Sequence, residues 1–107
     1  MSIDVPIDEL AATAERYDFA YVVTVSDSGR PHLVAVRPTV SGDELSVSVG
    51  RTSLANATAR PEIALVYPPV EDGGMSLVVD ATASSSGEAP GVLRLTATSA
   101  LLHRPAP

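Results

Sequence analysis

A short segment near the middle of the chain combines groups that bind anions. Arg51, Thr52 and Ser53 open the run RTSLANATA, which predicts a short helix between two strands. The first turn of a helix carries unpaired N–H groups and the positive end of the macrodipole, so an arginine there suggests that something negative binds. A guanidinium, two hydroxyls and free N–H groups at one point suit a phosphate monoester. The alternative is that Thr52 or Ser53 simply caps the helix while Arg51 extends into solvent.

Two further residues are candidates for the same anion site. Arg37 shares a face with Leu33 and Ala35 in an apolar strand, where a charged side chain needs a partner or an exit to solvent. It could close on one dianion together with Arg51, or it could be an ordinary arginine of an edge strand. Asn56 lies three residues after Ser53, on the same helix face. Its amide could reach the same ligand or bond to a neighbouring turn.

Other kinds of site find little support in the sequence. His32 and His103 are the only histidines, neither has a carboxylate at metal-ligand spacing, and the chain has no cysteine. No serine stands in a G-x-S-x-G pattern, and no pair of carboxylates suggests general acid–base catalysis. We therefore expect no metal site and assign no catalytic side chain.

Length and charge limit the class of protein. A chain of 107 residues with 45% hydrophobic residues supports one domain over residues 1–107 with one core. All seven basic residues are arginine, and the formal net charge is -6, which argues against nucleic acid as a partner. No apolar run approaches the ~20 residues of a membrane span, and we expect a cytoplasmic protein.

Hydrophobic periodicity predicts two helices and six strands. An amphipathic stripe predicts a helix over residues 7–17, and the second helix runs from about Thr52 to Ala59, ended by Pro61. The strands are FAYVVTV, HLVAVRPTV, LSVSV, IALVY, MSLVVDATAS and VLRLTATSALLH. Turn signals separate them, and TASSSGEAPG is predicted to be a hairpin loop.

Tight turns between successive strands favour an antiparallel sheet, and six strands with few obvious edges favour a small barrel. The predicted class is mainly β, or α+β if the helices are counted. Strands such as VVTV and LVVDA are apolar on both faces, which is more apolar surface than one small core can bury. We therefore expect a homodimer.

The order of these elements resembles the split-barrel family that includes pyridoxamine 5'-phosphate oxidase and the deazaflavin-dependent reductases. The most specific part is VSVGRTSLANATARPEIAL, which is similar to the family's strand, phosphate-contacting cluster, helix with Asn, and residue-Pro step. The hairpin FAYVVTVSDSGRPHLVAVRPTV extends the likeness over nearly the whole chain. One departure is the absence of the family's lysine, where Leu54 or Ala55 stands instead.

The resemblance implies a six-stranded antiparallel split β-barrel with two short helices. It also implies a dimer that holds FMN, or alternatively an 8-hydroxy-5-deazaflavin coenzyme, in a cleft between the subunits. By position, Arg51, Thr52 and Ser53 would hold the phosphate, Arg37 would approach it, and Asn56 would support the loop. The implied activity is hydride transfer to a small substrate. Because of the missing lysine, a non-catalytic or cofactor-free dimer is the alternative.

Overall fold

The computed structural model describes residues 1–84 and 91–107, where an antiparallel sheet contains most of the regular secondary structure. Its strands in chain order are β1 (Ser2–Asp4), β2 (Ala20–Val25), β3 (Pro31–Val36), β4 (Thr39–Ser41), β5 (Glu44–Ser48), β6 (Glu62–Tyr67), β7 (Ser76–Ala83) and β8 (Val92–His103). The short 3-10 helix η1 (Ile7–Glu9) continues into helix α1 (Leu10–Ala14), and helix α2 (Arg51–Ala59) joins β5 to β6. Most of the predicted TASSSGEAPG loop lies outside the described residues.

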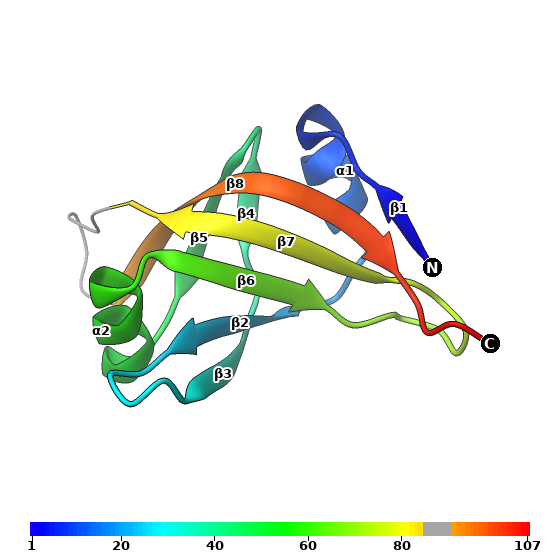
Figure 1. Ribbon diagram of the computed structural model, residues 1–107. Coiled ribbons are helices and arrows are strands. Elements are labelled where there is room, and N and C mark those ends of the chain that lie inside the picture. Colours follow the sequence, from blue (N-terminus) through cyan, green and yellow to red (C-terminus); the bar gives the residue numbers. More distant parts are fainter. Residues whose placement is uncertain (85–90) are drawn as a thin grey trace.

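The sheet is curled into a half-open barrel. The strands follow the order β3-β2-β6-β7-β8-β5-β4, and β1 pairs with the last part of β8. Strands β3 and β4 are consecutive in the chain but stand at opposite ends of this order, so the barrel is split between them. The long strands β7 and β8 arch across the middle of the molecule (Figure 1). The predicted antiparallel split barrel is confirmed.

Alternation of side chains decides which face of each strand is buried. In β5, Leu45 and Val47 are buried while Ser48 is exposed, as the sequence pattern predicts. Turns between neighbouring strands rely on glycine where the backbone has a positive φ. Gly29 (φ 83°) ends the β2–β3 turn, and Gly42 (φ 60°) lies between β4 and β5.

The structure differs from the prediction in three places. The predicted strand HLVAVRPTV is two strands, because Pro38 has no N–H to donate and the chain turns at Arg37–Pro38 from pairing with β2 to pairing with β5. The first helix ends at Ala14 and does not reach Tyr17. Strand β1 was not predicted, and it is formed by pairing Ile3 with Leu102 of β8.

The two helices close opposite ends of the barrel. Helix α1 contributes Leu10 and Ala14 to the core, and α2 contributes Ala57. Figure 1 shows α1 and α2 at opposite ends of the long strands. The centre of the core consists of fully buried leucines, Leu10, Leu45, Leu65, Leu77, Leu93 and Leu95. In the part of the chain that the structure describes, no helix has the length and hydrophobicity to cross a membrane.

Candidate anion site at the start of helix α2

The first turn of α2 presents backbone N–H groups without a capping side chain. The N-cap is Gly50, which has no side chain to accept a hydrogen bond, and no side chain of residues 1–84 and 91–107 caps this end. The first helical hydrogen bond runs from Leu54 N to Gly50 O (3.1 Å). The N–H groups of Arg51, Thr52 and Ser53 precede that bond and so have no acceptor within the helix. The first turn also contains no acidic residue that would repel an anion.

Arg51 and Thr52 are exposed at this helix end. The ion pair found among the described residues joins Arg60 to Asp27, and Arg51 takes part in no ion pair with a carboxylate of these residues. Its guanidinium is therefore available to an external anion. A cation beside unpaired N–H groups raises the local positive potential, since the helix macrodipole has the same sign there.

Ser53 and Asn56 lie on the opposite, buried face of α2. Their exposed fractions are 1% and 6%. The Asn56 amide Nδ2 donates to the Thr24 hydroxyl of β2 (3.2 Å), and Thr24 is itself fully buried. Asn56 thus fixes the helix on the sheet. The 1% exposure of Ser53 covers its backbone as well, so the accessible groups of the first turn belong to Arg51 and Thr52.

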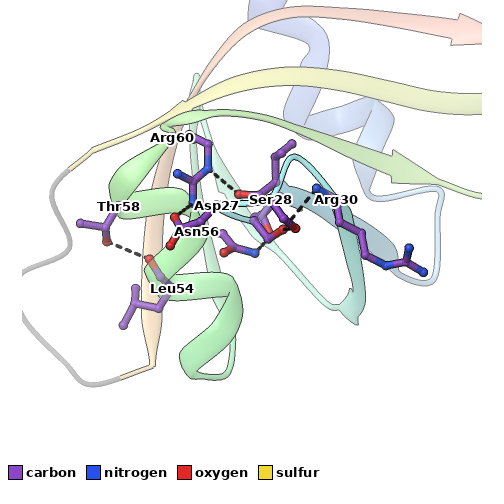
Figure 2. A network of polar contacts seen from close by, with 10 residues as sticks. Asp27, Ser28, Arg30, Leu54, Asn56, Thr58 and Arg60 are labelled. Carbon is purple, nitrogen blue, oxygen red and sulfur yellow. Dashed lines mark hydrogen bonds and ion pairs between the residues drawn. The ribbon is translucent and has the colours of Figure 1, made fainter.

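The other end of α2 is fastened to the β2–β3 turn. Arg60 Nε donates to Val25 O (2.7 Å), and the Arg60 guanidinium pairs with the Asp27 carboxylate (2.9 Å). Figure 2 shows Arg60 reaching across to Asp27 while Asn56 lies against the same hairpin. The sequence predicted only a favourable dipole interaction for Arg60. Its contacts hold the helix, and hence the candidate anion site, in place.

Arg37 lies elsewhere. Strand β3 places His32 opposite Thr24, to which α2 is bonded, and Arg37 comes five residues further along. At ~3.3 Å per residue this is about 16 Å of chain. Arg37 lines a cavity beside α1, at the other end of the barrel. Within one subunit the structure does not bring Arg37 to the first turn of α2.

Sequence reasoning missed a buried polar group at the α1 end. Tyr67 is 3% exposed, and its hydroxyl has no hydrogen-bond partner among the described residues. Burial raises the pKa of Tyr67 to about 12. The alternation of IALVY predicts that its ring faces the core, but nothing in that pattern signals an unpaired hydroxyl.

No group of three or more potential metal-ligating residues occurs in residues 1–84 and 91–107.

Solved structures share this arrangement of strands and helices. A FAD-binding protein from Mesorhizobium loti superposes with a TM-score of 0.68 at 15% identity, over 95% of this chain and 96% of its own. A pyridoxamine 5'-phosphate oxidase-like protein from Lactobacillus delbrueckii gives 0.67 at 20% identity, over 91% and 93% of the two chains. An F420 reductase gives 0.65 at 16% identity, over 85% and 91%. The fold is the split barrel of the pyridoxamine 5'-phosphate oxidase-like proteins, which confirms the resemblance.

Sequence comparison identifies nearer relatives. The uncharacterized proteins Mb0449c of Mycobacterium bovis and MT0457 of Mycobacterium tuberculosis are each 38% identical over 120 aligned residues, covering 95% of this chain and 82% of theirs. This chain belongs to the same family as these two proteins. No family model matches the sequence.

Proposed function

We propose that this protein is a cytoplasmic, homodimeric oxidoreductase that binds FMN, or alternatively an 8-hydroxy-5-deazaflavin coenzyme, and transfers hydride to a small substrate. The observation that carries the proposal is the uncapped first turn of α2, where Arg51 has no carboxylate partner among the described residues. Solved structures with this fold include a FAD-binding protein and a reductase named for F420, a deazaflavin. Because a fold can serve many functions, the local site must support the proposal.

The residues at this helix end fit a phosphate group. The N–H groups of Arg51 and Thr52 would donate to its oxygens, and the Arg51 guanidinium would neutralise part of its charge. The Thr52 hydroxyl is exposed and can add a further hydrogen bond. Asn56 would act indirectly, by keeping α2 on β2. The phosphate proposal therefore rests on Arg51 and Thr52, with Ser53 buried beneath them and Arg37 outside the site of its own subunit.

A bound flavin or deazaflavin would supply the hydride chemistry itself. The chain would contribute binding and orientation, because a phosphate fixed at a helix end that is tied to two strand positions has little freedom to move. No side chain of this site is assigned as a proton donor.

The outward face of the sheet supports the proposed dimer. Leu33 of β3 pairs with Val23 of β2, and Tyr21 lies on the same face two residues away. Leu33 is 55% exposed and Tyr21 38% exposed in the single chain. Ala64 of β6 continues this apolar face beside Val23. A second copy of the chain that covers this surface would form the cleft in which the resemblance places the cofactor.

The alternative is a dimeric split-barrel protein without catalytic activity or without a cofactor. It is favoured by the weak set of side chains around the phosphate position. The chain has no lysine, and the Ser53 hydroxyl is turned toward the barrel. Arg51 would then be an exposed arginine, and Asn56 and Arg60 would have purely structural roles.

Absorbance spectroscopy of the freshly purified protein, followed by titration with FMN and with the deazaflavin, separates the two functions. The oxidoreductase proposal predicts a yellow protein or binding at micromolar or tighter dissociation constants. Arg51→Gln is expected to weaken binding about 10-fold to 100-fold, since hydrogen bonds to charged groups contribute about 1.5–3 kcal/mol. Arg104→Gln, which changes an exposed arginine near the C-terminus, is the matched control. A colourless protein that binds neither cofactor would contradict the oxidoreductase proposal and favour the cofactor-free dimer.

A further inference from the structure

A cavity of about 350 Å³ lies beside helix α1, at the end of the barrel opposite α2. Ala11 and Ala14 line it from the helix, and Pro38 and Val40 line it from the corner where β3 gives way to β4. These side chains form an apolar wall. The cavity is large enough for a small organic molecule but far too small for a flavin nucleotide, and typical ligand sites begin near ~300 Å³.

Tyr67 lines the same cavity and carries a buried donor with no acceptor. Its hydroxyl makes no hydrogen bond within the described residues, although only 3% of the residue is exposed and the hydroxyl oxygen itself is buried. Like any tyrosine hydroxyl, it is protonated at neutral pH, and burial raises the pKa of Tyr67 further. A phenylalanine would fill the same space without leaving a polar atom unpaired. An acceptor on a bound molecule would satisfy the hydroxyl once the side chains that cover its oxygen have moved aside.

The neighbouring Tyr17 shows the difference. Its ring lies 5.7 Å from that of Tyr67, and its hydroxyl donates to Met75 O (2.7 Å). Tyr17 is thus satisfied by the protein itself. Of this aromatic pair, only Tyr67 has a donor left for a ligand, within the part of the chain that the structure describes.

Charges of both signs line the cavity. Arg37 lies on the β3–β4 side, and Glu15 and Asp18 lie where the chain leaves α1. All three are exposed, and none of them forms an ion pair within residues 1–84 and 91–107. A simple anion would be repelled by the two carboxylates, and a simple cation by the guanidinium. A ligand with one charge of each sign avoids both repulsions.

We propose that this cavity binds a small zwitterion of the amino-acid class. Its carboxylate pairs with Arg37, its ammonium group lies toward Glu15 and Asp18, and a neutral acceptor at its far end takes the hydrogen bond of the Tyr67 hydroxyl. The methylene groups between them contact the apolar wall. This site is separate from the proposed cofactor site, and the proposal does not depend on flavin binding.

Isothermal titration of the full chain with L-glutamine provides the first test. Glutamine has both charges and a neutral amide acceptor, and we expect a dissociation constant of about 1 mM or tighter. Leucine lacks the acceptor and glutaramate lacks the ammonium group, so each is expected to bind at least about tenfold more weakly. A thermal-shift screen of the other common amino acids accompanies the titration, because a ligand of the native state raises the melting temperature. If no amino acid binds, the proposal is wrong.

Substitutions then assign the binding to this cavity. Tyr67→Phe keeps the ring and is expected to weaken glutamine binding about tenfold while leaving leucine binding unchanged. Arg37→Gln is expected to weaken both. The controls are Tyr21→Phe on the outward face and Arg16→Gln, which lies on the same segment as Glu15 but does not line this cavity. Equal glutamine binding by wild type and Tyr67→Phe would overturn the proposal.

Arg51→Gln separates this proposal from the cofactor proposal. It is expected to leave amino-acid binding unchanged, because Arg51 belongs to the helix at the other end of the barrel. Loss of amino-acid binding in this variant would contradict the assigned location. Failure of FMN to bind would leave the amino-acid site unaffected.

Discussion

Because of Tyr67, the free energy of unfolding should fall at alkaline pH. Its pKa is raised from 10.0 to about 12 by burial, so the folded state holds its proton after the unfolded chain has lost it. This contribution is fully present below pH ~10 and is lost as the pH rises through about 12. Two pKa units at ~1.4 kcal/mol each give a loss of about 3 kcal/mol. Urea unfolding at several pH values should show this loss in the wild type.

Tyr67→Phe is expected to remove that part of the alkaline destabilisation. Its stability at neutral pH should equal or exceed that of the wild type, because no buried hydroxyl is left unpaired. Tyr17, whose pKa burial also raises, is unchanged in both proteins and so contributes equally to both curves. An identical pH dependence in the two proteins would mean that Tyr67 is exposed in solution.

At the residue scale, sequence alone separated few of the candidate side chains by role. The position of Arg51 in the first turn of a helix could be predicted, because helix polarity is a local property of the sequence. The burial of Ser53 and Asn56 was not, since α2 is rich in alanine and small polar residues and has no apolar stripe to identify its inner face. Tyr67 was predictable as a core residue, but its unpaired hydroxyl depends on neighbours that are distant in sequence.

The connection between helix α2 and the β2–β3 turn predicts unequal effects for its two partners. Arg60→Gln removes the donor to Val25 O and should destabilise the fold by about 1–2 kcal/mol. Asp27→Asn should change stability by less than about 0.5 kcal/mol, because the Asp27 side chain is 95% exposed and exposed ion pairs contribute little. Chemical denaturation of both variants measures the difference. Equal losses would assign the stabilisation to the ion pair.

Most elements could be predicted because their periodicity is strong. Strand β8 (Val92–His103) and helix α2 follow the predicted bounds closely. The interruption at Arg37–Pro38 was signalled by the proline, but the apolar residues on both sides concealed the change of pairing partner. Strand β1 has only three residues, all exposed, and its conformation comes from pairing with β8. Such a short segment carries no periodicity of its own.

For the whole molecule, the exposed apolar face of the sheet predicts self-association. Leu33→Glu places a charge at the 55% exposed position on this face, and should shift the protein to monomers in sedimentation velocity. The stability of the monomer should change by less than about 0.5 kcal/mol, as is usual for surface substitutions. Exposed Thr98→Glu, on the adjoining part of the sheet, would show how far the interface extends. A wild type that already sediments as a monomer would contradict the dimer.

The architecture separates two proposed sites at opposite ends of one barrel. The split barrel was expected from the resemblance, but neither the strand order nor the separation of β3 from β4 was predicted, because both depend on non-local pairing. That resemblance also placed Arg37 with Arg51, whereas the folded chain places Arg37 beside α1. The sequence made Arg37 and Arg51 candidates for binding an anion, but only the folded topology shows that they lie apart in one subunit.

The central claim is that a small dianion binds at the first turn of α2. Paired titrations with FMN and riboflavin test it most directly, because the two ligands share the ring system and differ only in the phosphate. We predict that the wild type binds FMN at least about tenfold more tightly than riboflavin, and that Arg51→Gln reduces this ratio toward one. Equal binding of FMN and riboflavin by the wild type, or an unchanged ratio in Arg51→Gln, would contradict the claim.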